Sequence, residues 1–126
     1  MQDFKFTVWV SLCYSFACWL NSEPVDTNTL LVLKTLASPV RLTILEWLKS
    51  PARHFPPQVD GDLEKDGVCA DYIRDKLGIA AATASRHLSL LTTAGLLTAT
   101  RKKGWTFYRR QERAIAAFTK QLRSDL

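Results

Sequence analysis

The chain has 126 residues, of which 47% are hydrophobic and 23% charged, and a formal net charge of +5. This length is enough for one hydrophobic core and excludes two of ordinary size. The basic excess favours an anionic partner. The sequence contains no Gly-rich phosphate loop, nucleophile motif or metal-spaced histidine cluster, which argues against an enzyme.

The N-terminal part, residues 1–24, contains an almost wholly apolar stretch over residues 6–20. A membrane-spanning helix needs about 20 such residues, so we do not expect a membrane anchor. Lys5 is the only cation before the stretch and no Ala-x-Ala site follows it, which disfavours a signal peptide. We interpret residues 1–24 as an apolar helix that packs against the last helix across a dimer, with a membrane-associated tail or a leader absent from the native product as the alternatives.

Two amphipathic helices are predicted next, over residues 26–37 and 39–49. Ser38 is a good N-cap for the second helix, and Pro39 fits its first helical position. The periodicity predicts these inward-facing side chains: Leu30, Leu33 and Leu36 or Ala37 in the first helix, and Leu42, Ile44, Leu45 and Leu48 in the second.

Residues 51–67 are predicted to be an insertion without helical structure, because prolines and glycines interrupt residues 52–67 and no helical period is present. Asp60, Asp62, Glu64 and Asp66 alternate as in a calcium loop, but Lys65 stands where that loop needs glycine. We therefore interpret the segment as a solvated acidic turn. Its length suggests a role that the sequence does not specify.

A helix-turn-helix pattern follows the insertion. A short helix is predicted over residues 68–77, then a turn at Gly78 and Ile79, then a second helix over residues 81–94. Gly95 can adopt the left-handed conformation that ends this second helix.

The second of these helices has two distinct faces. Its apolar stripe of Ala84, Leu88 and Leu91 suits packing on a helical core. The opposite face lacks the long Glu and Lys side chains of an ordinary solvated helix, and its short or cationic groups suit base edges and phosphates. The residues of this polar face are Ala82, Thr83, Ser85, Arg86, Ser89 and Thr93.

Residues 97–100 and 105–108 are predicted strands, and the Lys102-Lys103-Gly104 turn between them indicates a β-hairpin. From residue 86 to residue 113, seven basic residues stand against one acid, so this segment carries +6 while the rest of the chain is close to neutral. Such a local excess is typical of a surface that neutralises phosphates. A solvated basic face is the alternative. The basic residues are Arg86, Arg101, Lys102, Lys103, Arg109, Arg110 and Arg113.

A last helix is predicted over residues 112–124, with an apolar stripe of Ile115, Phe118 and Leu122. Two alanines beside the stripe allow a partner helix to approach closely. By itself, the stripe suits closure of the core of a monomer.

In this order and spacing, the chain resembles the ArsR-type winged helix-turn-helix transcriptional repressors over roughly residues 30–110. The resemblance implies a mainly α fold with a small β-hairpin, the wing, and a homodimer formed through the N-terminal and C-terminal helices. Residues 25–111 would be the DNA-binding domain and residues 112–126 the dimerisation helix. The matching residues are 33–45, 77–79, Thr83, 85–88, Leu91, 94–96, Arg101, Gly104 and Tyr108.

The resemblance also implies a function. Two protomers would read a palindromic operator in double-stranded DNA and repress transcription until a small signal releases them, and we expect this activity in the cytoplasm. The competing hypothesis is a winged-helix protein-interaction module that does not bind DNA. The expected DNA contacts are Thr83, Ser85, Arg86, His87 and Ser89 on the helix, and Arg101, Lys102 and Lys103 on the wing.

Two positions depart from the family pattern. Ala80 stands where the family often has a serine at the start of the recognition helix, and the loss of such a cap typically costs about 1 kcal/mol. Trp105 replaces a residue that is often basic in the wing, which favours a packing role over a phosphate contact.

The cysteines are candidate effector ligands. Cys69 matches the first cysteine of the Cys-Val-Cys box of arsenical sensors in the family, and Asp71 stands where the second would be. Cys13 or Cys18 of a partner chain would then complete a site for arsenite or a thiophilic metal, or the thiols would form a redox disulfide. The alternative is three buried cysteines that serve as small hydrophobic residues.

Overall fold

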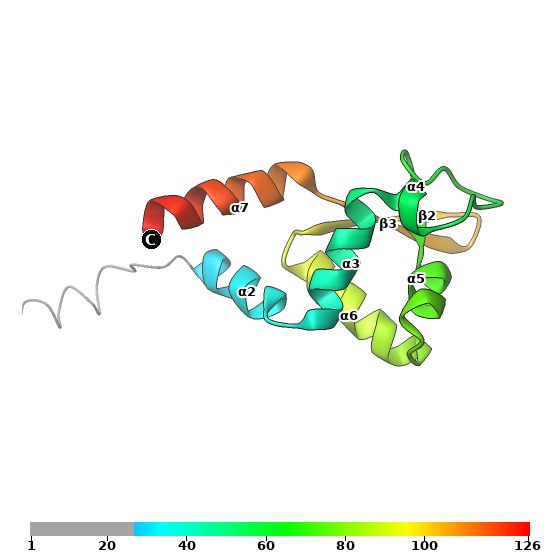
Figure 1. Ribbon diagram of the computed structural model, residues 1–126, viewed down its shortest axis with the longest axis horizontal. Coiled ribbons are helices and arrows are strands. Elements are labelled where there is room, and N and C mark those ends of the chain that lie inside the picture. Colours follow the sequence, from blue (N-terminus) through cyan, green and yellow to red (C-terminus); the bar gives the residue numbers. More distant parts are fainter. Residues whose placement is uncertain (1–26) are drawn as a thin grey trace, which may run out of the picture.

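The computed structural model describes residues 27–126, and the expectations for residues 1–24 lie outside this range (Figure 1). The predicted fold class is confirmed, since a mainly helical chain carries one small antiparallel sheet. The elements in chain order are α2 (Thr27–Leu36), α3 (Pro39–Lys49), α4 (Pro51–His54), β1 (Val68–Cys69), α5 (Ala70–Leu77), α6 (Ala81–Thr93), β2 (Leu97–Lys102), β3 (Trp105–Arg110) and α7 (Glu112–Asp125).

The helix-turn-helix consists of α5, a turn and α6. Gly78 is left-handed (φ 68°), and its N–H donates to the carbonyl of Arg74 at 2.9 Å, which ends α5 as predicted. Gly95 is also left-handed (φ 81°) and follows α6 directly. The predicted apolar stripe of α6 is confirmed, because Ala84, Leu88 and Leu91 are all buried.

The wing is the β2–β3 hairpin, whose strands pair from Leu97 opposite Arg110 to Lys102 opposite Trp105. A third strand, β1, pairs with the other edge of β3, so the sheet order is β1-β3-β2. The prediction of a helix from residue 68 is therefore wrong at its first two residues. The four-residue apolar spacing that indicates helix starts at Cys69, but the free edge of β3 pairs with Val68 and Cys69, and no local pattern reveals that pairing.

The apolar faces predicted for the first two helices are partly wrong. Leu30, Leu33 and Leu42 are 45%, 37% and 51% exposed, whereas α2 buries Val32 and Thr35. Burial of Thr35 is inexpensive because its hydroxyl donates to the carbonyl of Leu31 at 2.8 Å. The remaining residues predicted to face inward behave as expected: Ile44, Leu45 and Leu48 are buried and Leu36 packs against the core.

Helix α4 lies where the sequence predicted irregular chain. Pro51 fits the first position of a helical turn, and this turn closes with the Phe55 N–H bonded to the Pro51 carbonyl at 2.9 Å. The buried Phe55 ring meets Trp47 edge-on, with 6.0 Å between ring centroids, and Lys76 of α5 lies 5.0 Å from the Trp47 ring. The first part of the insertion is therefore fixed to α3 and α5.

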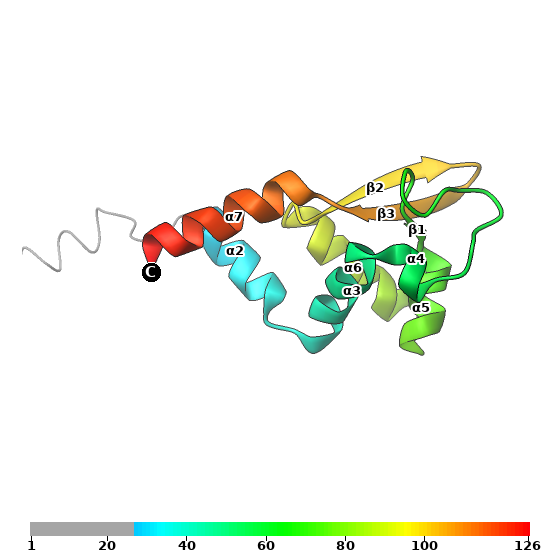
Figure 2. The same ribbon diagram turned by 45° about the horizontal axis from the view of Figure 1, so that its top comes forward.

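The two ends of the molecule are built from different elements. Helices α2 and α7 lie side by side at one end, and the wing lies at the other end beside residues 56–67, which we call the acidic loop (Figures 1 and 2). The core between them is built on α3, α5, α6 and β3, with Ile44, Ile73, Leu88, Leu91 and Phe107 among its most deeply buried side chains. Within residues 27–126, no helix is both long and apolar enough to cross a lipid bilayer.

Candidate nucleic-acid interface

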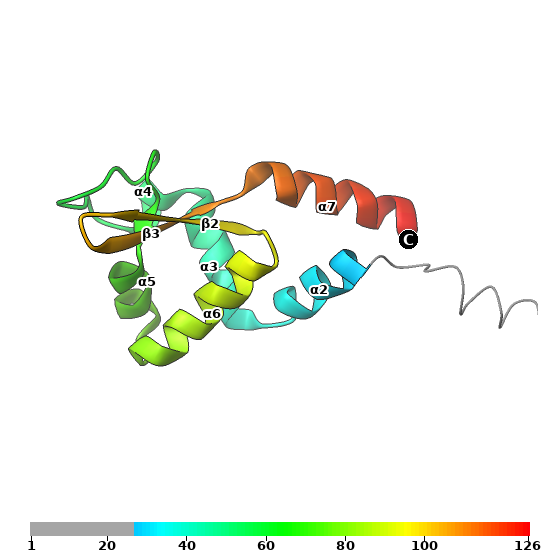
Figure 3. The same ribbon diagram turned by 180° about the vertical axis from the view of Figure 1, so that it is seen from behind.

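Helix α6 crosses the face of the molecule seen in Figure 3. Its stripe of buried residues points into the core, which turns Thr83, Ser85, Arg86 and Ser89 outward, and all four are exposed. Among the residues that the structure describes, none forms a hydrogen bond or ion pair with these four side chains. This face therefore presents short hydrogen-bonding groups and one guanidinium without an internal partner in residues 27–126.

His87 lies at the inner border of this face and is half-buried. Its Nδ1 lies 3.1 Å from Nη1 of Arg41, and Nε of the same arginine donates to the carbonyl of Thr35. Because arginine can only donate, Nδ1 accepts and the ring hydrogen lies on Nε2. Burial, and then the charges of Arg41 and Arg86, lower the pKa of His87. Neutral His87 thus connects α6 to α3 and, through Arg41, to the end of α2.

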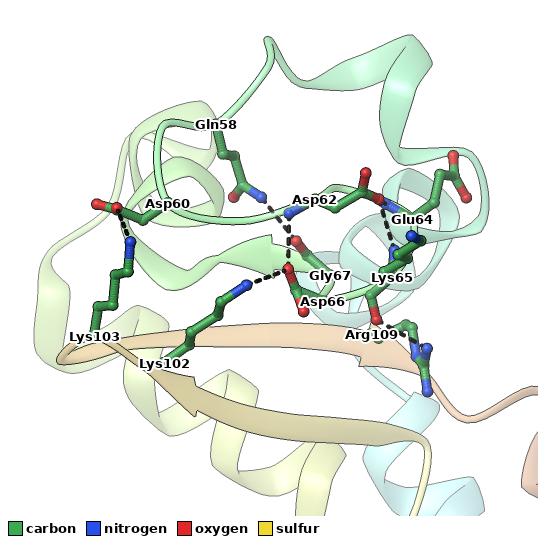
Figure 4. Close-up of polar contacts among 10 residues, drawn as sticks. All are labelled: Gln58, Asp60, Asp62, Glu64, Lys65, Asp66, Gly67, Lys102, Lys103 and Arg109. Carbon is green, nitrogen blue, oxygen red and sulfur yellow. Dashed lines mark hydrogen bonds and ion pairs between the residues drawn. The ribbon is translucent and has the colours of Figure 1, made fainter.

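The wing places three predicted DNA contacts at its tip, but their surroundings differ. Arg101 is exposed, and no residue in the range 27–126 pairs with its guanidinium. By contrast, Lys102 Nζ lies 3.3 Å from Oδ2 of Asp66, and Lys103 Nζ lies 3.4 Å from Oδ1 of Asp60 (Figure 4). Two of these three predicted contacts are therefore shared with the acidic loop.

The acidic loop is organised by its own carboxylates. Oδ1 of Asp62 accepts the backbone N–H groups of Glu64 and Lys65 at 2.9 Å each, and Oδ2 of Asp66 accepts the N–H of Asp62 at 2.9 Å (Figure 4). These hydrogen bonds are the main reason that the pKa values of Asp62 and Asp66 lie below the ordinary 3.8. The interpretation as a merely solvated turn is therefore incomplete, because the acids fix the loop and hold it to the wing.

Further contacts hold the acidic loop against β1 and β3. The Gln58 side chain donates from Nε2 to the carbonyl of Gly67 at 2.9 Å and accepts from the N–H of Cys69 at 2.6 Å. Nη1 of Arg109 donates to the carbonyl of Lys65 at 3.0 Å. This arrangement was not predicted from the sequence. The opposite charges of residues 60–66 and 101–103 are the sequence feature that could have indicated it.

Arg110 belongs to the basic segment but serves the fold. Its Nη1 donates to the carbonyl of Leu45 at 2.9 Å, and its Nε pairs with Oε1 of Glu112 at 2.7 Å. The guanidinium therefore joins α3, β3 and the start of α7. Not all of the +6 charge counted along the sequence is available to a partner.

Of the three cysteines proposed as effector ligands, Cys69 is the one that lies in the part of the chain that the structure describes. Cys69 is buried where β1 meets α5, while Cys13 and Cys18 lie outside the described residues. Within residues 27–126 no three His, Cys, Asp or Glu side chains are grouped so that they could hold a metal ion. Cys69 alone offers one thiol, and a soft-metal or arsenite site needs more than one.

The fold and the outward face of α6 define a winged helix-turn-helix transcriptional regulator. The chain is 40% identical over 104 residues to the uncharacterised HTH-type transcriptional regulator YbzH of Bacillus subtilis (strain 168), a match that covers 82% of this chain and 99% of the relative. No family model matches the sequence.

Solved structures agree with this class. The homodimeric winged helix-turn-helix DNA-binding domain of a possible ArsR-family regulator from Mycobacterium bovis is 27% identical, with 78% of this chain and 79% of that chain covered and a TM-score of 0.54. HlyU from Vibrio cholerae N16961 shares the fold at 21% identity, with 76% and 89% covered and a TM-score of 0.52. The chain belongs to the HTH-type transcriptional regulators, which are not enzymes, and it shares the winged helix-turn-helix fold of its ArsR-family structural neighbours.

Proposed function

We propose that this regulator is a homodimeric, cytoplasmic repressor that binds a palindromic operator and leaves it when a small signal binds. The observation that carries the proposal is the outward face of α6. It combines Thr83, Ser85 and Ser89 with Arg86, and within residues 27–126 all four side chains lack internal partners.

Helix α6 is the recognition helix in this proposal. Short side chains and neighbouring alanines allow its backbone to come close to the floor of the major groove. Arg86 supplies a guanidinium for a guanine edge or a phosphate, and the hydroxyl groups of Thr83, Ser85 and Ser89 bond to bases or backbone. His87 borders the DNA and, through Arg41, sets the position of the helix.

The wing contributes contacts to the DNA backbone. Arg101 offers its charge directly, whereas Lys102 and Lys103 must leave Asp66 and Asp60 or share them with the phosphates. Exposed ion pairs are typically worth about 0–1 kcal/mol, so the phosphates can compete for these lysines. The acidic loop therefore reduces the contribution of the wing without abolishing it.

The dimer forms at the end of the molecule that holds α2 and α7. Leu30, Leu31 and Leu33 are exposed there, and none of the residues of α7 is fully buried in the single chain. An apolar surface of this kind favours a second copy, as does the homodimeric relative from Mycobacterium bovis. A two-fold dimer would require an operator with matching half-sites.

In this proposal, residues 25–111 form the DNA-binding domain, and residues 1–24 and 112–126 form the dimer contacts.

The signal is proposed to act on the cysteines, as arsenite, a thiophilic metal or a redox change. Cys69 would act with Cys13 or Cys18 of the second protomer. A variant with all three cysteines replaced by serine is expected to stay on the operator in the presence of arsenite and oxidants. Release equal to that of the parent would remove the cysteines from the signal pathway.

Binding of a fluorescent fragment of the protein's own upstream promoter tests the DNA proposal. Fluorescence anisotropy should show an affinity that falls steeply with salt, and Arg86→Ala should weaken binding about 10-fold or more. Arg53→Ala is the matched control, because Arg53 is exposed on α4 and outside the proposed interface. Equal binding by the Arg86→Ala variant and the parent would favour the protein-interaction module.

A further inference from the structure

Two features that DNA binding leaves unexplained, Trp105 and the acidic loop, border the same cleft. The cleft has a volume of about 320 Å³ and lies between residues 58–60 of the loop, α5 and β3. This volume lies at the lower end of the range for small-molecule sites. The cleft is separate from the outward face of α6, since no residue of α6 lines it.

Apolar side chains line the cleft from three sides. Trp105 of β3 is 45% exposed and Val59 of the loop is 94% exposed, so both offer apolar surface to a ligand in the cleft. Tyr72 of α5 contributes a half-buried ring, and the buried Phe107 completes the wall. Covering this surface would remove apolar area from water, and the rings of Trp105 and Tyr72 are the aromatic groups that a ligand can reach.

The charges around the cleft determine which ligand fits. Asp60, Asp71 and Asp75 line it, and Arg74 is the only cation among its lining residues. Arg74 lies 3.0 Å from Oδ1 of Asp75 and 3.5 Å from Oδ1 of Asp71, so its charge is already shared between two carboxylates. Even with Lys103 counted as the partner of Asp60, the site stays net negative. An anion is therefore disfavoured, and a cation gains from both the carboxylates and the aromatic faces.

We propose that this cleft binds a small organic cation with an aromatic or bulky apolar body, of the quaternary ammonium or aromatic amine class. Asp60 connects the cleft to the wing, because its carboxylate lines the site and also holds Lys103. Lys103 is one of the wing residues proposed to contact the DNA backbone, so a ligand in the cleft would bind beside that contact. A role as effector rests on the DNA-binding function proposed above, whereas binding itself does not depend on it.

The test uses the full chain without DNA and benzyltrimethylammonium as the probe, with phenylacetate as its anionic counterpart. Isothermal titration calorimetry should show saturable binding of the cation at millimolar or lower concentration and at least tenfold weaker binding of the anion. Trp105→Ala and Asp71→Asn should each weaken cation binding at least fivefold. Trp105→Leu keeps the apolar bulk without the π face and should also lose affinity. Glu46→Gln, which removes an exposed carboxylate of α3, should leave binding unchanged.

Three results would overturn the proposal: no saturable binding of the cation, equal binding of phenylacetate, or unchanged affinity in both Trp105 variants. Circular dichroism of each variant separates loss of the site from loss of the fold. Because DNA is absent, these results leave the operator proposal untouched. Conversely, a failure of Arg86→Ala to weaken operator binding would contradict the operator proposal but not the ligand site.

Discussion

Helix α6 and the wing were both expected to contact DNA, but the protein holds them in different ways. Buried side chains fix α6 from behind and leave its outer groups without partners among the described residues. The wing is held from the side by the acidic loop, through ion pairs to Lys102 and Lys103. The formal charge of the wing is therefore larger than the charge that is available to a partner. In the proposed DNA complex, α6 meets the bases with an unoccupied face, whereas the wing lysines meet phosphates in competition with carboxylates.

The largest expected effect comes from forcing the acidic loop away from the sheet while α6 stays intact. Gly67 has φ 101°, and a Cβ placed there would lie 2.3 Å from the carbonyl oxygen of Tyr108, a backbone atom that cannot move easily. Gly67→Ala should therefore lower the free energy of unfolding by roughly 3 kcal/mol, measured by urea denaturation.

Gly104→Ala is the matched control for that substitution. Gly104 has φ 83°, but a Cβ placed there would have no neighbouring atom within 4 Å. Its replacement by alanine therefore carries the backbone strain without the clash. We expect a cost of about 1 kcal/mol. If both variants lost equal stability, the close approach of the loop to β3 would not matter.

The next largest effect is expected from removing the two carboxylates that compete with phosphates for the wing lysines. Asp60→Asn with Asp66→Asn frees Lys102 and Lys103, so operator affinity should rise, up to about tenfold at low salt. The slope of log affinity against log salt should steepen by about one to two units, because each new phosphate contact adds roughly 0.9. Anisotropy titrations over a salt series measure both quantities.

Glu46→Gln serves as the control, since it also removes an exposed negative charge but lies on α3, outside the acidic loop and the wing. An equal gain in affinity for this variant would point to net charge alone. Unchanged affinity in the double variant would mean that the wing lysines do not reach phosphate.

A smaller effect is expected at the start of α6. Ala80 occupies the N-cap of α6 with extended backbone and offers no side-chain hydrogen bond. Ala80→Ser should stabilise the protein by about 1 kcal/mol, seen as a higher urea midpoint with an unchanged m-value. Ala82→Ser, two residues inside the helix, should show no such gain, and a comparable gain there would contradict a capping effect.

The smallest effect concerns His87. Burial and the charges of Arg41 and Arg86 lower its pKa from the ordinary 6.5 in the folded state, so the unfolded chain binds the proton more tightly. The contribution of neutral His87 to stability is therefore present above pH 6.5 and is lost as the pH falls from there toward the lowered pKa. His87→Gln should flatten this part of the stability profile, measured by thermal unfolding from pH 5 to 8. A profile as steep as the parent's would assign the slope to other groups.

The elements that the sequence predicts well are those with local signals. The periodicity of Ala84, Leu88 and Leu91 locates α6 and its outward face, and Gly78 and Gly95 mark the ends of α5 and α6. Each signal lies within a few residues of the structure that it specifies, so no knowledge of the rest of the chain is needed.

The features that escape prediction depend on distant partners. Strand β1 exists because β3, almost 40 residues later in the chain, offers it an edge. Apolar spacing shows that Leu30 and Leu42 share helix faces with other leucines, but not what those faces meet, and in the single chain both are exposed. The ion pairs of Asp60 and Asp66 with the wing require the folded hairpin and could not be inferred from either segment alone.

The Gln58 side chain has a consequence for solubility. The carbonyl of Gly67, directly before β1, and the N–H of Cys69 in β1 lie at the border of the sheet away from β3. By satisfying both, one amide takes the place of a neighbouring strand. An open sheet border invites pairing with another molecule and, from there, aggregation. Gln58 thus closes that route with a single side chain.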